Sequence, residues 1–321
     1  MKKQFKFADL FCGGGLGARG AVTAGFLPVL SVDAWEMAGA TYKDNFSGSN
    51  VMVDRIENIN PRKVLNGEKI DLLLGSPECT NHSPAKGASP RCEESRRTAF
   101  NMVNWAEDLK PRWIVMENVS HMRSWARYQE LISDLKGLGY NIREQVLNAA
   151  DFGVPQSRKR LFVICDLYAE PDEVRPLSEA APKSVASILD PRGTWRTTPL
   201  FSPKRAEPTL VRARDAIANL GEDASFILVY YGSDGGGGWQ TLDMPLRTVT
   251  TLDRFALVEN INGEHRMRML QPPELARAMG LPPVHLFNHG TRRDKVKLCG
   301  NGVCAPVMQA VIETLKNKPA Q

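Results

Sequence analysis

The chain has 321 residues, and 42% of them are hydrophobic, which is ordinary for a folded protein with a buried core. This length exceeds a typical single domain, so we expect one large domain and one smaller one. The formal charge of +5 permits a nucleic-acid partner but does not exclude enzymes of small molecules, many of which carry similar charge.

The cysteines and the apolar runs argue against a metal-binding, a disulfide-rich and a membrane protein. The six cysteines contain no Cys-x-x-Cys pair, and the set Cys79, His82 and Cys92 lacks a fourth ligand, so no metal site is expected. A chain of this size needs no disulfides. The first residues lead almost at once into a strand pattern without a signal-peptide core, and apolar runs such as 113–116 are too short to cross a bilayer. We therefore expect a cytoplasmic protein with reduced thiols and no membrane partner.

Strand and helix patterns alternate through the first half of the chain. Strands are predicted at residues 5–11, 29–32, 51–53, 70–74, 113–116, 141–147 and 161–165. Helices are predicted from the first glycines to about residue 24, over a segment that carries Trp35 and Tyr42, and at 100–110 and 128–137. This alternation is typical of βαβ units, so we expect a mainly parallel, doubly wound sheet with ligands beyond the carboxyl ends of its strands.

The composition changes near residue 169. Residues 170–215 are rich in Pro, Arg, Ser and Thr, and the glycine run at 232–238 predicts a mobile loop. Strand-like pieces are predicted at 226–231, 248–250 and 255–258, and helices at 270–279 and about 306–315. We expect a second, less regular domain, after which the chain returns to the first.

A glycine-rich turn directly follows the first predicted strand. Its sequence is Asp9-Leu-Phe-Cys-Gly-Gly-Gly-Leu-Gly, and its glycines permit a sharp turn and a close approach to a ligand. Backbone N–H groups at the start of the next helix favour a polar or anionic group. Asp33 and Asp54 close the next two strands, where a carboxylate suits ribose hydroxyls or an adenine amino group. These features predict a nucleoside cofactor, with an NAD or flavin enzyme, or a turn that only packs a helix, as alternatives.

Polar residues also follow the fourth and fifth predicted strands. Cys79 lies after the fourth, where a thiolate would act as a nucleophile, although a lone cysteine is more often inert core. Residues 80–97 predict a basic loop that either closes over a phosphate backbone or stays a solvated surface loop. Glu117 follows the fifth strand at the same sheet edge, and Gln156-Ser-Arg-Lys-Arg precedes the last strand.

In this order the motifs resemble those of the cytosine-5 DNA methyltransferase family, over nearly the whole chain except residues 170–262. The six matching motifs are Asp9-Leu-Phe-x-Gly-x-Gly, Gly75 to Ser83, Glu117-Asn-Val, Gln156-x-Arg-x-Arg, Arg268 to Gly280, and Gly300-Asn-Gly-Val. Their order places the variable residues 170–262 where this family reads its DNA sequence.

The resemblance implies a Rossmann-like doubly wound mixed sheet, the S-adenosylmethionine-dependent methyltransferase fold, with a smaller irregular target-recognition domain. It assigns residues 1–169 to a catalytic and cofactor-binding domain, 170–284 to target recognition, and 285–321 to a segment that returns to the catalytic domain. S-adenosylmethionine would bind and S-adenosylhomocysteine would leave, with no metal. The residues at the family's cofactor-binding positions are Asp9, Leu10, Phe11, Gly13, Gly15, Leu16, Asp33, Ala34, Asp54, Arg55, Ser76, Asn301 and Val303.

The resemblance also implies the chemistry. Cys79 would add to carbon 6 of a flipped-out cytosine, so that carbon 5 can accept a methyl group. Glu117 would hold the N3 edge and supply a proton, while Arg160 and Arg158 would bind the base's carbonyl oxygen or orient Glu117. Ser83 would touch phosphate.

The sequence departs from the family's pattern at three places. Glu78 stands where the family usually has proline before the cysteine, Thr80 replaces the usual glutamine, and Asp33-Ala34-Trp35 replaces a Glu-Trp pair. We interpret Ser-Pro-Glu-Cys-Thr as a variant of the nucleophile motif.

Double-stranded DNA is the expected partner, and the protein is expected to be a monomer in the bacterial cytosol, encoded by a bacterium or a phage. A cognate restriction endonuclease in the same system is left open, as is the recognition sequence. Two alternatives remain: a cytosine-5 methyltransferase of transfer RNA, and a non-catalytic DNA-binding relative.

Overall fold

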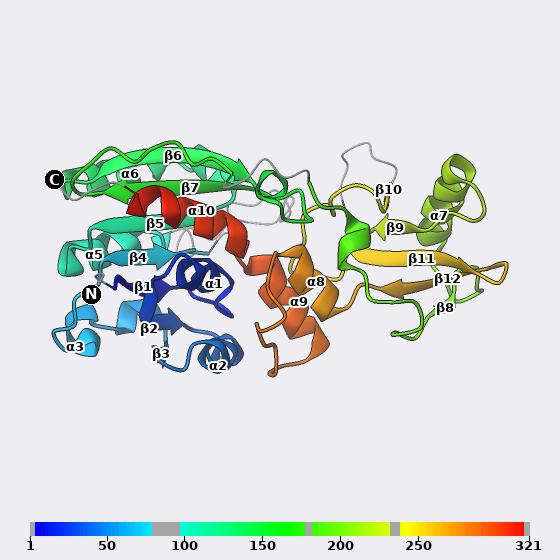
Figure 1. Ribbon diagram of the computed structural model, residues 1–321, viewed down its shortest axis with the longest axis horizontal. Coiled ribbons are helices and arrows are strands. Elements are labelled where there is room, and N and C mark those ends of the chain that lie inside the picture. The colour runs from blue at the N-terminus through cyan, green and yellow to red at the C-terminus, as the bar shows by residue number, and fades with distance from the viewer. Residues whose placement is uncertain (1–3, 79–96, 177–181, 232–237, 318–321) are drawn as a thin grey trace.

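The computed structural model describes residues 4–78, 97–176, 182–231 and 238–317. These residues form two lobes, each built on its own sheet, with helices between them (Figure 1). The large lobe comprises residues 4–78, 97–176 and 305–317, and the small lobe comprises residues 182–231 and 238–269.

The sheet of the large lobe has seven strands among the described residues, in the order β3-β2-β1-β4-β5-β7-β6. They are β1 (Lys6–Leu10), β2 (Leu27–Asp33), β3 (Asn50–Val53), β4 (Leu72–Gly75), β5 (Trp113–Asn118), β6 (Asn141–Asn148) and β7 (Lys159–Asp166). Only β7 runs antiparallel to its neighbours in this order, and the other pairs are parallel. The predicted mixed, doubly wound sheet is confirmed. Because β7 is reversed, it begins at the edge where β1, β4 and β5 end.

Helices cover both faces of this sheet because its strands bury alternate residues on opposite sides. One face carries α1 (Leu16–Thr23), α2 (Glu36–Asn45) and α10 (Ala305–Lys316); the other carries α3 (Pro61–Leu65), α5 (Phe100–Leu109) and α6 (Tyr128–Gly137). In β5, Trp113 and Val115 pack into the first core, and Ile114 and Met116 into the second. Short 3-10 helices lie at Ile56–Asn58 (η1), Ser120–Ser124 (η3) and Ala149–Phe152 (η4).

The small lobe is more regular than its composition predicted. Its antiparallel sheet has the order β10-β9-β11-β12-β8, and one face is covered by α7. The elements are η5 (Val185–Ile188), β8 (Thr198–Pro199), α7 (Glu207–Leu220), β9 (Phe226–Val229), β10 (Trp239–Thr241), β11 (Phe255–Ile261) and β12 (Glu264–Met269). The predicted strand at 248–250 is wrong. The N–H and C=O groups of Val249 bond to the side chains of Gln156 and Arg158 instead of to a neighbouring strand.

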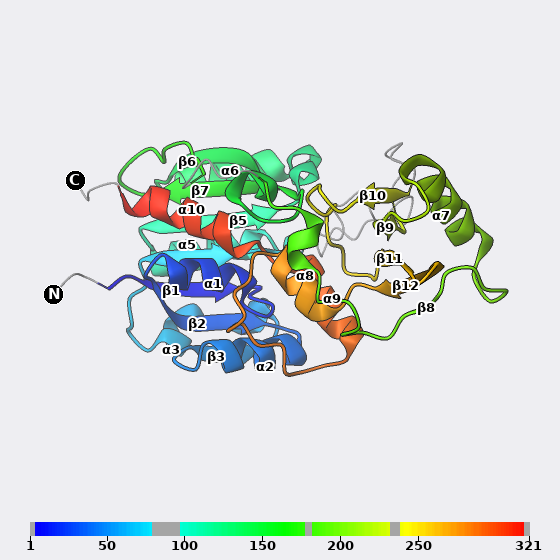
Figure 2. The ribbon, with the colours of Figure 1, turned by 45° about the vertical axis from the view of Figure 1, so that its right-hand side comes forward.

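The two lobes share a hydrophobic core. The face of the small sheet opposite α7, with Ile227, Val229, Phe255 and Leu257, joins the same cluster of buried residues as α1 and α10. Helices α8 (Pro272–Ala278) and α9 (Arg292–Asn301) lie where the lobes meet (Figure 2).

The helical stretch Arg292–Lys316, formed by α9 and α10, is long and apolar enough by composition to span a bilayer. However, 67% of its most apolar window is buried inside the protein, as in the core helix of a folded domain. Burial against α1 accounts for its apolar character.

Candidate cofactor and catalytic site

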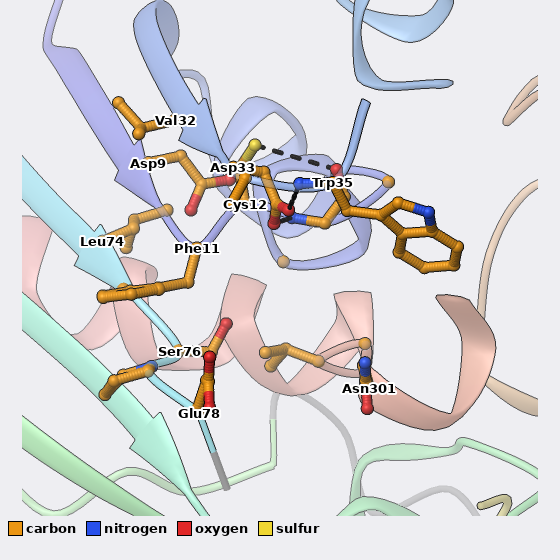
Figure 3. Close-up of a pocket in the computed structure, with 18 of the residues that line it drawn as sticks. Asp9, Phe11, Cys12, Val32, Asp33, Trp35, Leu74, Ser76, Glu78 and Asn301 are labelled. Carbon is orange, nitrogen blue, oxygen red and sulfur yellow. Dashed lines mark hydrogen bonds between the residues drawn. The ribbon is translucent and has the colours of Figure 1, made fainter. Parts of the chain in front are cut away.

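A cavity of about 610 Å³ opens at the carboxyl edge of β1, β2 and β4, where the parallel sheet was predicted to bind a ligand. Figure 3 shows its wall, with Asp9, Phe11 and Leu74 from the sheet edge and Asn301 from α9. The cavity is large enough for a nucleoside-sized ligand.

The glycine-rich turn forms one side of the cavity. Phe11, Gly13 and Gly15 have left-handed backbones with φ of 56, 52 and 79°, so the chain reverses tightly before α1. The Gly13 N–H donates to Asp33 Oδ2 at 2.8 Å, and the Trp35 N–H donates to Asp33 Oδ1 at 2.8 Å (Figure 3). The Gly13 N–H of the glycine-rich turn is therefore hydrogen-bonded to a carboxylate of the protein and does not face a bound anion.

Most of the predicted cofactor-binding residues line the cavity. They are Asp9, Phe11, Gly13, Leu16, Asp33, Ala34, Asp54, Arg55, Ser76, Asn301 and Val303. Two others lie elsewhere. Leu10 is fully buried in the core on the opposite face of β1. Gly15 is glycine because a Cβ there would lie 2.4 Å from the Phe46 ring.

Sequence reasoning predicted Asn301 but missed the helix α9 that carries it. Gly300 and Asn301 end this helix, which the sequence pattern did not predict. Lys297 lies one turn before Asn301, and its Nζ is 4.3 Å from the centre of the Trp35 ring. The spacing of four residues between Lys297 and Asn301 is the signal that would have placed both on one helix face. Glu57, Glu78 and Thr98 are further wall residues that were not predicted as such.

The cavity wall is predominantly acidic. Its acidic side chains are Asp9, Asp33, Asp54, Glu57, Glu78 and Glu117, and its basic ones are Arg55 and Lys297. Arg55 Nε lies 3.5 Å from Glu57 Oε2, so the opposite charges of these two side chains offset each other. Burial, together with the nearby Asp33 charge, raises the pKa of Asp9 to about 8. Such a wall favours a cationic ligand over an anionic one.

Glu117 lies near the end of β5 and is only 5% exposed. Burial raises the pKa of this carboxyl group, while the charges of Arg160 and Arg158 oppose the shift. Arg160 Nε lies 3.3 Å from Glu117 Oε1, yet that oxygen accepts no aligned hydrogen bond from the residues that the structure describes. A buried carboxylate oxygen without a donor is costly, so it marks a place for a ligand that donates a hydrogen bond.

Asn118 connects Glu117 to the start of the predicted nucleophile loop. Its Nδ2 donates to the Pro77 carbonyl at 3.0 Å, and its Oδ1 accepts from the Val119 N–H at 2.8 Å. Pro77 is thereby held two residues before Cys79. Cys79 and Ser83, with His82 and Cys92, lie outside the described residues.

The two arginines of the Gln156-x-Arg-x-Arg motif have different surroundings. Arg160 faces Glu117, whereas Arg158 is 3% exposed and donates to three backbone carbonyls. Its Nη1 lies 2.9 Å from Val249 O, and its Nη2 lies 2.9 Å from Gly300 O and 3.0 Å from Gly302 O. These bonds favour a positioning role for Arg158. Within the ranges that the structure covers, no cluster of three metal-ligating side chains occurs.

A family model described as C-5 cytosine-specific DNA methylase matches residues 5–317. Among relatives, the type II methyltransferase M.HindV of Haemophilus influenzae is 31% identical over 165 residues, covering 51% of this chain and 54% of that protein. M1.HphI of Haemophilus parahaemolyticus is 33% identical over 166 residues, covering 49% of this chain and 45% of that protein. These matches therefore span about half of each relative's length. M.FnuDI of Fusobacterium nucleatum is 23% identical over 335 residues, covering 97% and 94%.

Solved structures share the fold. A DNMT2 mutant of Spodoptera frugiperda superposes with a TM-score of 0.73 at 18% identity, covering 98% of this chain and 100% of that one. The methyltransferase EhMeth of Entamoeba histolytica gives 0.71 at 17% identity and covers 98% of both chains.

Proposed function

This chain belongs to the C-5 cytosine-specific DNA methylase family, and on that premise we propose that it methylates carbon 5 of cytosine in a specific sequence of double-stranded DNA. The observation that carries the proposal is the buried Glu117 carboxylate, whose Oε1 lacks an aligned donor among the described residues and which lines the acidic cavity. S-adenosylmethionine, when bound in that cavity, supplies the methyl group as an electrophile.

The cavity suits this cofactor better than a dinucleotide. S-adenosylmethionine carries a positive sulfonium, whereas NAD and flavin dinucleotides carry an anionic diphosphate. The acidic wall would repel a diphosphate, and the Gly13 N–H that could bind one is occupied by Asp33. Asp33, fixed by two backbone N–H groups, would hold the ribose hydroxyls of the cofactor. Phe11 and Trp35 would contact its adenine ring.

The catalytic assignments follow from the motif order and from the site. Addition of the Cys79 thiolate to carbon 6 of cytosine converts the ring to an enamine, which makes carbon 5 nucleophilic. Glu117 would hold the N3 edge, and its raised pKa suits it to supply a proton as charge develops there. Arg160 would orient Glu117 and reach the base's carbonyl oxygen. Because these atoms are inaccessible in a stacked duplex, the target base would be flipped out.

The remaining assignments are part of the same proposal. Residues 1–169 and 285–321 would form the catalytic domain, residues 170–284 would read the DNA, and Ser83 would contact phosphate. Several relatives are named type II methyltransferases, which supports a role in a restriction–modification system with a cognate endonuclease. A monomer acting on DNA in the cytoplasm fits this role.

Bisulfite sequencing of DNA from cells that express the chain tests the proposal, with Cys79→Ala expressed in parallel. We expect protected cytosines within one recurring sequence for the unchanged chain and none for Cys79→Ala. Purified protein should also form a covalent adduct with a duplex that contains 5-fluorocytosine at that sequence. Methyl transfer to transfer RNA alone would replace DNA as the substrate. Tight DNA binding without an adduct would indicate a non-catalytic relative.

A further inference from the structure

Glu78 is the residue of the site that departs most clearly from the family's usual motif. It lies between Pro77, whose carbonyl is held by Asn118, and the proposed nucleophile Cys79. Its side chain is exposed at the cavity wall, which it lines together with Ser76 and Asn301 (Figure 3). The anchored carbonyl before it means that Glu78 enters the cavity from a fixed point of the backbone.

The charge of Glu78 acts across the cavity. Burial is the largest cause that raises the pKa of Asp33, and the negative charge of Glu78 raises it further, against the N–H groups of Trp35 and Gly13 and the charge of Lys297. In Figure 3 Asp33 lies in the upper part of the view and Glu78 in the lower part, with Phe11 to the left and Asn301 to the right of Glu78. Two carboxylates that repel one another across a cavity are both stabilised when a cation enters between them.

The position of Glu78 identifies which part of the ligand it would face. Asp33 is fixed by the glycine-rich turn and the start of α2, at the end of the cavity proposed for the ribose. Glu78 is the immediate neighbour of Cys79, so it belongs to the end at which the methyl group is transferred. The donor carries its sulfonium charge at that end. During transfer the methyl–sulfur bond breaks and its electron pair stays on sulfur, so the product is a neutral thioether.

We propose that the Glu78 carboxylate discriminates between the two forms of the cofactor, binding the sulfonium of the methyl donor in preference to the thioether of the spent product. This inference rests on the proposed function. It makes Glu78 a specificity-determining residue for the charge of the bound sulfur. The expected consequence is faster exchange of product for fresh donor.

The test measures the dissociation constants of S-adenosylmethionine and S-adenosylhomocysteine by titration calorimetry in the full chain and in Glu78→Gln. Glutamine keeps the shape of the side chain and removes its charge. We expect donor affinity to fall about fivefold while product affinity changes less than about twofold, the size of one charge interaction in partly exposed surroundings. Glu78→Asp should keep most of the preference because it keeps the charge.

Glu57→Gln is the matched control, because it removes another carboxylate of the same cavity wall, which pairs with Arg55 and accepts from Asn101 Nδ2 at 3.2 Å. It should change both affinities by the same factor. If Glu78→Gln weakens both ligands equally, or neither, the proposal for Glu78 is overturned while the methyltransferase proposal stands. If the unchanged chain binds neither ligand, the proposed cofactor itself is wrong and the inference falls with it.

Discussion

Three carboxyl groups of the cavity hold their protons more tightly than free side chains do. Burial is the largest cause for Asp9, Asp33 and Glu117, and no described cation offsets it fully at any of them. Ionisation of a buried carboxyl group whose pKa is raised costs folding stability. The same shift makes such a group a better proton donor than a free carboxyl group, because it holds its proton to a higher pH.

Replacement of Glu117 by glutamine should show whether the side chain acts as a proton donor or only fills space and forms hydrogen bonds. Glutamine fits the same space and still hydrogen-bonds, but it cannot release a proton, so methyl transfer should fall roughly 100- to 10,000-fold. The affinity for S-adenosylmethionine should stay within about twofold, because among the described residues no hydrogen bond joins Glu117 to the glycine-rich turn. Single-turnover transfer to a duplex oligonucleotide, together with calorimetry, measures both quantities. A variant that keeps a tenth of the rate would exclude Glu117 as the proton donor.

Asp9 should make folding stability depend on pH in a defined direction. Its pKa rises from 3.8 when unfolded to about 8 when folded, so the folded state binds more protons between these values. This group therefore contributes stability below about pH 4 that is lost as the pH rises through 8. Asp9→Asn removes the contribution, so its Tm should fall less than that of the unchanged chain between pH 5 and pH 8. Parallel pH slopes in thermal unfolding without cofactor would show that Asp9 is ionised throughout.

At the scale of elements, the strands of the large lobe were predicted from the sequence, whereas the strand predicted at 248–250 was wrong. The strands of the large lobe could be predicted because each forms its bonds with adjacent strands, and alternation or apolar runs record that. In segment 246–251 the N–H and C=O groups of Val249 bond to the side chains of Gln156 and Arg158, which lie some 90 positions earlier in the chain. No local pattern records such bonds, so 248–250 was predicted as a strand.

The residues of the site divide in the same way into those with a local sequence signal and those positioned by tertiary packing. The turn, Asp33 and Glu117 could be predicted because they follow strands at one sheet edge. Lys297 was missed because α9 is polar over most of its surface, and its spacing of four residues from Asn301 indicates a shared helix face only once the helix itself is recognised. Leu10 and Gly15 belong to the predicted cofactor motif, but their neighbours in the fold are core residues.

Close packing of α9 on segment 246–251 predicts an effect of one added methyl group. A Cβ at Gly300 would lie 2.3 Å from the Thr250 carbonyl carbon, which belongs to the backbone and cannot rotate away. Gly300→Ala should therefore cost about 1–3 kcal/mol of unfolding free energy. It should also weaken cofactor binding, because Asn301 is displaced. Gly48→Ala is the control, because a Cβ there meets nothing within 4 Å. Equal urea midpoints for the two variants would contradict this packing.

At the scale of the molecule, the shared core makes the two lobes one cooperative unit. The inner face of the small sheet and the α1–α10 face of the large sheet belong to one cluster of buried residues. Leu246, fully buried within it, lies between the lobes. Domains that share a continuous apolar core are expected to unfold together rather than in turn.

Leu246→Ala should lower the unfolding free energy by about 2–5 kcal/mol and should leave a single transition. Hydrogen exchange of peptides from β5 and from β11, measured across a urea series, follows each sheet separately. Both should lose protection at the same urea concentration, in the variant as in the unchanged chain. Earlier loss of protection in β11 would mean that the small lobe unfolds by itself.

The backbone path through segment 246–251 determines which residues can be exchanged between this chain and a relative. The chain leaves the small sheet after β10, binds the large lobe through Val249, and re-enters the small sheet at β11. The part of the protein proposed to read DNA is thus not a contiguous cassette. A graft from a relative should replace residues 198–241 and 255–269 and keep the host's intervening segment, so that Gln156 and Arg158 keep their own partners.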